Sequence, residues 1–455
     1  MIHLKRHKFS SWLKMTWIPM ILFNTACKKL DIEKIDEEIR YIRNREEATF
    51  ILDETYSIIK GSIDINSDGT GDFFYTDYIL STALYSGEAI YKGSESSWSQ
   101  FEDHTLNPNN KILSELWFTG YRILDNVNII LRDVPHLDDL SSDEKDELIG
   151  QASAIRAFIN FILVNLFENI PLVTVSLTNS EYPAQSAKSD IYEQIISDLQ
   201  VSNTLLSAEN ITDKEAVNQQ VAEALLARVF LYTQQWQDAL EYANKIIQSG
   251  LYTLDTNYSE AFLNTSSKEI IWKLDYRSSN DINVLGYYTF PADSGGIFEY
   301  RPANEQINAF EANDKRKSYC INSIDDICFI AKYKDPAEGK FDIPLIRYSE
   351  IVFIAAEAQH QLGDRSSASD HINVVRSRAE LQNLPVDDIT SDTILHELMC
   401  EFAYEGHRWL DINRYDKATE IIGKTDNDFL EHQLLWPIPQ EALDKNMNLV
   451  QNPGY

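Results

Sequence analysis

The chain has 455 residues, with 40 Lys and Arg against 71 Asp and Glu, so its formal net charge at pH 7 is −31. Because proteins that bind phosphate backbones present basic patches, this charge argues against nucleic acid as a partner. Such a charge favours solubility but carries no information about the fold.

The N-terminal residues predict a lipoprotein export signal. A basic lead precedes the first acidic residue, and its members are Lys5, Arg6, Lys8 and Lys14. The apolar stretch 15–23 that follows is too short to cross a bilayer as a helix, which is typical of a secretory signal. Because Cys27 directly follows Thr25 and Ala26, we expect cleavage of 1–26 and acylation of the Cys27 thiol, which anchors a protein to a membrane without a transmembrane helix. The alternative is an ordinary cleaved signal in which Cys27 has no role.

Long segments with apolar residues three and four positions apart predict a helix-rich chain. In chain order these segments are 38–60, 110–133, 141–167, 189–206, 216–233, 236–249, 347–362, 365–380 and 392–415. Ser141 is a typical N-cap, because acidic residues follow it in the first turn.

Two pairs of adjacent helices share a small-residue pattern. Ala227 precedes Ala239 by twelve residues, and Ala356 precedes Ala368 by the same interval. Tetratricopeptide repeats use small residues in this way to let two antiparallel helices approach closely. We therefore predict a mostly α fold with a tetratricopeptide-like helical-repeat scaffold of about four helix pairs. The scaffold is expected to comprise about 38–60, 110–250 and 347–455.

Two long interruptions separate the predicted helices. Residues 61–109 and 252–346 are rich in Gly, Ser, Asp and aromatic residues, and 269–274 has the composition of a strand. Loops of this length inside a compact domain are usually functional. We expect the two regions to fold together as an irregular, loop-rich binding lobe of a single domain that spans 27–455.

Aromatic residues in these two regions are candidates for ligand binding, because a ring offers a large, rigid surface at low entropy cost. Trp98 is the first candidate, since it lies in the polar run 93–100; packing inside the protein is the alternative. The other candidates are Tyr75, Tyr78 and Tyr91 in the first region and Tyr287, Tyr288, Phe298 and Tyr300 in the second. We expect two to four of these side chains to contact ligand.

One polar segment has the spacing of a calcium loop. Its oxygen-bearing residues are Asp64, Asn66, Asp68 and Asp72. Tyr75 occupies the position where such a loop carries its bidentate acid, and a polar turn explains the segment equally well. We expect no cofactor other than this weak calcium candidate.

Other reactive residue types suggest structural roles. His396 begins a zinc-protease-like pattern, but Cys400 stands where the second His is needed. Four charged residues recur at three-residue spacing and are expected to form an ion-pair network: Glu405, Arg408, Asp411 and Arg414. No catalytic residue is expected.

Two cysteines lie close together in the second interruption. Cys320 and Cys328 could close a short loop, since export permits disulfides. The alternative is that both are free thiols.

Several segments, taken in order, resemble the SusD/RagB family of outer-membrane nutrient-binding lipoproteins from Bacteroidetes-type bacteria. They are 116–128, 150–158, 167–173, 224–232, 347–358, 401–414, 436–440 and 451–455. The resemblance implies a helical-repeat scaffold with a loop-rich binding lobe, located on the outer membrane facing the cell exterior. It also implies a SusC-like TonB-dependent barrel transporter as partner and a ligand site drawn from the two interrupting regions.

The predicted function is therefore binding of nutrient oligosaccharides at the cell surface and their delivery to that transporter, without catalysis. One alternative is the same architecture with peptides as ligands. The other is a surface hydrolase of the same compartment.

Overall fold

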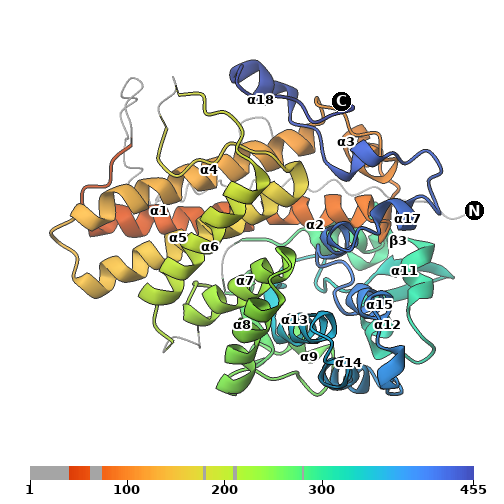
Figure 1. Ribbon diagram of the computed structural model, residues 1–455. Coiled ribbons are helices and arrows are strands. Elements are labelled where there is room, and N and C mark those ends of the chain that lie inside the picture. The colour runs from red at the N-terminus through yellow and green to blue at the C-terminus, as the bar shows by residue number, and fades with distance from the viewer. Residues whose placement is uncertain (1–39, 62–73, 178–180, 209–212, 279–280) are drawn as a thin grey trace, which may run out of the picture. The chain divides into compact units, whose positions relative to one another are not determined.

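The computed structural model describes residues 40–61, 74–177, 181–208, 213–278 and 281–455. Helices predominate in these residues, and the strands are short (Figure 1). The helices are α1 Arg45–Lys60, α2 Phe74–Tyr85, α3 Ser96–Glu102, α4 Lys111–Asp133, α5 Ser142–Phe167, α6 Lys188–Leu205, α7 Gln219–Tyr232, α8 Trp236–Ser249, α9 Glu260–Leu263, α10 Leu285–Thr289, α11 Asn304–Ala309, α12 Lys315–Cys320, α13 Tyr348–Gln361, α14 Arg365–Arg378, α15 Ser391–Glu401, α16 Arg408–Arg414, α17 Ala418–Ile422 and α18 Gln440–Lys445. The strands are β1 Ala89–Tyr91, β2 Ile270–Leu274, β3 Tyr300–Pro302, β4 Ile321–Ile324, β5 Ile327–Ile330 and β6 Ile343–Arg347.

Successive long helices pack one against the next, and Figure 1 shows this run from the orange helices to the blue ones. The order of contact is α1, α4, α5, α6, α7, α8, α13 and α14, which makes four pairs. Ala227 and Ala239 are fully buried in α7 and α8, as are Ala356 and Ala368 in α13 and α14. Small side chains at these positions let the paired helices approach closely. The predicted mostly α, tetratricopeptide-like fold is confirmed.

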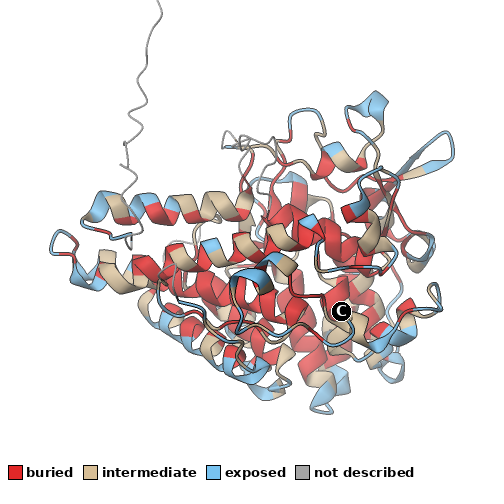
Figure 2. Cartoon of the chain, turned by 90° about the horizontal axis from the view of Figure 1, so that it is seen from above, coloured by how far each residue is buried: buried red, intermediate tan, exposed pale blue. Residues whose placement is uncertain are grey.

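The third helix of the run, α5, begins with a capping box. The Ser141 hydroxyl accepts a hydrogen bond from the Glu144 backbone N–H, and the Glu144 carboxylate accepts one from the Ser141 N–H (2.9 Å). Among the described helices, α5 is the one long and apolar enough to cross a membrane, but 89% of its apolar window is buried inside the protein. Its apolarity is explained by its position between α4 and α6. Figure 2 shows such buried helix faces in red.

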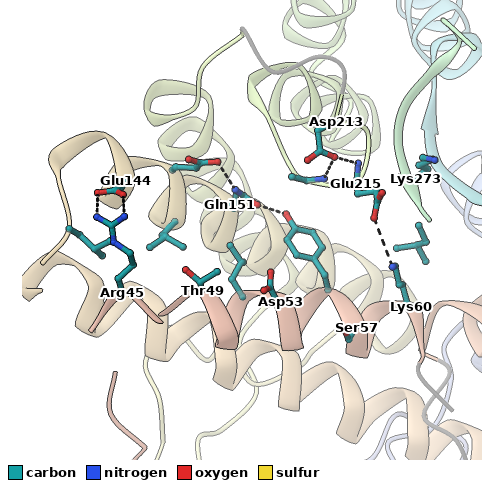
Figure 3. Close-up of a pocket in the computed structure, with 17 residues that line it drawn as sticks. Arg45, Thr49, Asp53, Ser57, Lys60, Glu144, Gln151, Asp213, Glu215 and Lys273 are labelled. Atoms are coloured by element: carbon teal, nitrogen blue, oxygen red, sulfur yellow. Dashed lines mark hydrogen bonds and ion pairs between the residues drawn. The ribbon is translucent and has the colours of Figure 1, made fainter. Parts of the chain in front are cut away.

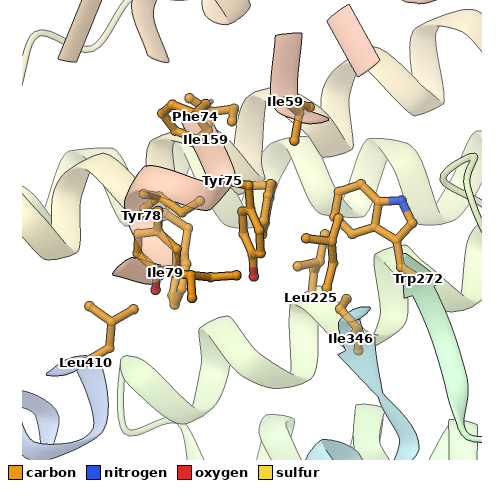
Figure 4. Packing of buried hydrophobic residues seen from close by; sticks show 14 of the residues in the cluster. Ile59, Phe74, Tyr75, Tyr78, Ile79, Ile159, Leu225, Trp272, Ile346 and Leu410 are labelled. Atoms are coloured by element: carbon orange, nitrogen blue, oxygen red, sulfur yellow. The ribbon is translucent and has the colours of Figure 1, made fainter. Parts of the chain in front are cut away.

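The first interruption contains a helix that the sequence pattern did not predict. Every residue of α2 is buried, so its apolar residues do not gather on one face and show no helical period. Tyr75 and Tyr78 lie on this helix; Figure 4 shows them among Ile79, Leu225 and Leu410. They belong to the hydrophobic core rather than to a loop.

The predicted helix over 392–415 is two helices instead of one. α15 ends at Glu401 and α16 begins at Arg408. Tyr404 and Gly406 between them have φ of 63° and 83°, which an α-helix cannot contain. The turn carries the Gly406 carbonyl to the Tyr78 hydroxyl, which donates a hydrogen bond to it (2.8 Å).

The strands form three antiparallel two-stranded sheets, β1 with β3, β2 with β6 and β4 with β5. The first of these joins the two interrupting regions, with Ala89 opposite Pro302, Ile90 opposite Arg301 and Tyr91 opposite Tyr300. The predicted strand at 269–274 is confirmed as β2. The pairing of β1 with β3 sets the geometry of the candidate site.

Cys320 and Cys328 are free thiols. The prediction of a disulfide between them is therefore wrong, and the alternative of two free thiols is confirmed. Register explains why. In the β4–β5 hairpin Ser323 lies opposite Cys328, whereas the Cys320 carbonyl accepts from the Ala331 N–H (2.7 Å). The two sulfur-bearing residues are therefore offset along the hairpin.

Candidate functional site

Five of the aromatic candidates contact one another where the two interrupting regions meet. The Tyr91 and Tyr300 rings face each other across β1 and β3, with centroids 5.1 Å apart. Tyr300 also contacts Trp98 at 5.5 Å and Tyr288 at 5.7 Å, and Tyr288 contacts Tyr287 at 5.8 Å. We call these five residues the aromatic cluster.

The members of the aromatic cluster differ in exposure. Tyr300 is fully buried, and Tyr91 and Trp98 expose 6% and 8% of their surface, whereas Tyr287 exposes 43%. Tyr288 is half-buried. The cluster thus has a buried base and an outer face that carries Tyr287 and Tyr288.

Trp98 belongs to the buried base, although it lies in a polar run of sequence. The Glu95 carboxylate caps α3 by accepting a hydrogen bond from the Ser97 N–H (3.2 Å), and the helix turns the indole inward against Phe101 and Tyr300. Trp98 is therefore buried although the residues around it in the sequence are polar. The packing role is the one that this geometry favours.

Phe298 lies beside the outer face in a constrained conformation. Its φ is 61°, a region that bulky residues rarely occupy. Its neighbours hold it there, because the Ile297 N–H donates to the Tyr287 carbonyl (2.8 Å) and the Glu299 N–H donates to the Tyr288 carbonyl (3.0 Å). The half-buried Phe298 ring therefore lies on the segment whose backbone is hydrogen-bonded to the backbone of Tyr287 and Tyr288.

Arg301 is a site residue that the sequence analysis missed. Its guanidinium carbon lies 4.0 Å from the centroid of the Phe298 ring, a cation–π contact. The available sequence signal was its place next to two aromatic candidates in the second interruption. What the sequence could not show is that the guanidinium packs on a ring.

The phenol groups of Tyr91 and Tyr288 are uncharged at neutral pH. Burial raises the pKa of Tyr91 and raises the pKa of Tyr288 to about 12. The Tyr91 hydroxyl accepts a hydrogen bond from the Glu95 N–H (3.1 Å) and donates to the Glu299 carboxylate (3.5 Å). Ring faces beside neutral hydroxyls and a guanidinium suit a ligand with both apolar faces and many polar groups.

Two other aromatic candidates lie away from the aromatic cluster, and two further predictions fall outside the described residues. Tyr75 and Tyr78 contact each other and are buried in the core, so the structure does not bring them to the outer face. Cys27 lies outside the described residues. So does the calcium candidate, Asp64, Asn66, Asp68 and Asp72.

A separate cleft of about 590 Å³ runs along α1 (Figure 3). Ion pairs cross it, between Arg45 and Glu144 (2.5 Å) and between Lys60 and Glu215 (4.0 Å). None of the predicted aromatic candidates lines it. It is lined by both charged and apolar side chains and by none of the rings of the aromatic cluster.

Three of the four charged residues predicted at 405–414 take part in buried ion pairs: Glu405, Asp411 and Arg414. Glu405 pairs with Lys332 (2.6 Å) and Arg347 (2.8 Å), and Arg414 pairs with Asp411 and Glu357. Among the described residues Arg408 forms no ion pair, and Asp411 with Arg414 is the one ion pair that joins two of the four residues predicted to form a network. On α15 the Cys400 Sγ lies 3.9 Å from the His396 Nε2. Burial raises the pKa of the Cys400 thiol, which disfavours a reactive thiolate.

Comparison with known proteins gives two family matches. Residues 54–231 match the family model described as starch-binding associating with outer membrane, and 329–455 match the SusD family. Among curated proteins, SusD-like protein P38 of Formosa agariphila is 22% identical over 99% of this chain and 100% of its own length.

Solved structures share the fold. A SusD superfamily protein from Bacteroides vulgatus covers 91% of this chain and all of its own, with a TM-score of 0.82 at 20% identity. A laminarin-binding SusD-like protein has the same coverage, with a TM-score of 0.77 at 22% identity.

Proposed function

This chain belongs to the SusD/RagB family, and from that premise we propose that it binds oligosaccharides through the aromatic cluster. The observation that carries the proposal is that rings from two regions far apart in sequence meet in one cluster with an exposed outer face. The fold shared with a laminarin-binding protein supports a glycan as ligand.

In the proposed mechanism the Tyr287 ring stacks on the apolar face of a sugar, and neighbouring polar groups accept and donate hydrogen bonds to its hydroxyls. Tyr300 and Trp98 hold the outer rings in place from below. A prearranged ring surface loses little conformational entropy when it binds. The protein does no chemistry on the ligand in this proposal.

We further propose that the protein is held on the outer membrane by acyl chains on Cys27 and passes its ligand to a SusC-like TonB-dependent transporter. The export signal and the family description, starch-binding associating with outer membrane, support this location. A tether would keep the aromatic cluster close to the transporter and so raise the effective concentration of captured ligand there.

Tyr287→Ala tests the aromatic cluster. Because stacking on an exposed ring contributes on the order of 1 kcal/mol, glycan affinity should fall about fivefold to tenfold. Isothermal titration with the glycans that wild type retains on an array measures the change. Tyr182→Ala is the matched control, because Tyr182 is a similarly exposed tyrosine on another segment.

Unchanged glycan affinity in Tyr287→Ala would contradict the assignment of the site. An array that includes peptides distinguishes the alternative ligand, since retention of peptides alone would favour it. Release of free sugars or amino acids from a bound polymer would instead favour a hydrolase.

A further inference from the structure

We propose that Arg301 recognises an anionic group on the bound glycan, a carboxylate or a sulfate ester, so that the site selects acidic oligosaccharides over neutral ones. The inference rests on the proposed function of the aromatic cluster. It adds the chemical class of the ligand and the residue that selects it.

The guanidinium of Arg301 lacks a counter-ion among the residues that the structure describes. Of the carboxylates that the structure describes, none forms an ion pair with it, and its buried Nε–H has no hydrogen-bond partner. Several other arginines are paired; Arg228 pairs with Glu350 (2.5 Å) and Arg156 with Asp198 (2.6 Å), whereas Arg408 shares with Arg301 an unpartnered Nε–H in the described structure. A buried donor without an acceptor is costly, so an acceptor supplied by a ligand would stabilise the bound state.

Arg301 is also held in a fixed position. The guanidinium carbon of Arg301 lies 4.0 Å from the centroid of the Phe298 ring. The backbone of Phe298 has a left-handed conformation, with φ of 61°. The preceding loop is tight, because a Cβ at Gly296 would overlap the carbonyl oxygen of Phe290. Strained backbone of this kind persists where the surrounding structure enforces it, often at ligand sites. A planar guanidinium held by a ring is preorganised for two parallel hydrogen bonds to a carboxylate or sulfate.

The acid nearest to Arg301 in the sequence is directed elsewhere. Glu299 is two residues before Arg301, but its carboxylate accepts a hydrogen bond from the Tyr91 hydroxyl (3.5 Å), and its carboxyl carbon lies 2.7 Å from the position that a Cβ on Gly93 would take. On the opposite strand, Ile90 faces Arg301. Glu299 therefore leaves the guanidinium available to an incoming anion.

The net charge of −31 disfavours anions at long range. At physiological ionic strength, however, charges more than about 8 Å apart are largely screened. Recognition of an acidic sugar therefore depends on direct contact with Arg301 rather than on attraction by the whole molecule. A direct charged contact also makes affinity sensitive to the single residue that provides it.

Arg301→Gln tests the inference with paired probes. The probes are oligogalacturonates with their methyl esters, and sulfated oligosaccharides with their desulfated forms, so that the members of each pair share a sugar backbone and differ in the anionic group. Wild type should bind at least one acidic member about tenfold or more tightly than its neutral partner, and Arg301→Gln should abolish that preference. Isothermal titration gives both affinities. Arg365→Gln removes the same charge from an exposed arginine on α14, apart from β3 in Figure 1, and should change nothing.

The outcomes separate this inference from the proposed function. The role of Arg301 is overturned if wild type binds the neutral and acidic members equally, or if Arg301→Gln keeps the preference for the acidic member. Either result leaves glycan binding through Tyr287 in place. Binding of no glycan, or glycan binding that Tyr287→Ala does not weaken, overturns the proposed function itself. Arg301→Lys is the substitute test in case Arg301→Gln does not fold. It keeps the charge but loses the planar fork of the guanidinium, so an intermediate preference for the acidic member is expected.

Discussion

At the scale of single residues, exposure divides the aromatic cluster into two kinds of side chain. Trp98 and Tyr300 pack edge to face beneath the surface, so their rings contribute mainly to stability and to the position of the outer rings. Tyr287 has 43% of its surface exposed and can meet a ligand directly. Substitutions at the two kinds of position should therefore change different measured quantities.

Trp98→Ala should destabilise the protein, because it removes a large side chain that is 8% exposed. Truncation of a buried aromatic residue costs about 3–5 kcal/mol, and urea unfolding followed by circular dichroism measures the change. Tyr287→Ala is the comparison, since a surface substitution should alter the free energy of unfolding by roughly 0.5 kcal/mol or less. Equal stability of the Trp98 variant and wild type would contradict the buried placement of the indole.

At the scale of elements, the turn between α15 and α16 links the scaffold to α2. Its conformation depends on Gly406, whose φ is 83° and whose carbonyl accepts a hydrogen bond from the Tyr78 hydroxyl (2.8 Å). A Cβ at this position would lie 2.7 Å from the Tyr78 ring. The glycine thus permits both the backbone conformation and the close approach of α2.

Gly406→Ala should lower the free energy of unfolding by more than Gly363→Ala does. Both glycines have positive φ, but a Cβ at Gly363 has nothing within 4 Å. The Gly363 variant should show the conformational cost alone, roughly 1 kcal/mol, and the Gly406 variant an additional cost from overlap with Tyr78. Chemical denaturation of both variants gives the comparison. Equal losses would mean that the Tyr78 ring moves aside freely.

At the scale of the whole molecule, stability should depend on pH through groups buried at the junction of α2, β1 and the 402–407 turn. Glu88 is 1% exposed, and its carboxylate accepts a hydrogen bond from the Tyr404 N–H (3.0 Å). Burial raises its pKa from 4.5 to about 7, despite nearby Arg408 and Lys332. The folded state therefore keeps this proton at pH values where the unfolded chain has released it.

Glu88→Gln should reduce the loss of stability between pH 5 and pH 8. In the wild-type protein the contribution of protonated Glu88 is complete below pH 4.5 and is lost as pH rises through about 7. The change amounts to about 2–3 kcal/mol over this interval. Urea unfolding of both proteins at pH 5, 6, 7 and 8 measures it. His407, whose pKa burial lowers to about 3, acts in the opposite direction and cancels in the difference between the two proteins.

The sequence by itself determined the helical-repeat scaffold and the family resemblance. Apolar periodicity and paired alanines are local patterns, and the helices at Lys111–Asp133, Ser142–Phe167, Trp236–Ser249 and Tyr348–Gln361 begin and end close to where those patterns do. It also identified the two regions from which the aromatic cluster is drawn. Helices on the surface of a core show their buried stripe in the sequence, which is why these elements were predictable.

Tertiary structure alone decided which aromatic residues share a surface. α2 is buried on all sides and leaves no periodic signal, so Tyr75 and Tyr78 could not be distinguished from loop residues. Trp98 is turned inward by a short helix, and Arg301 meets Phe298 only because hydrogen bonds to Tyr287 and Tyr288 hold that loop in place. Burial and ring contact depend on residues distant in sequence, here on the pairing of β1 with β3. Local pattern does not encode such contacts.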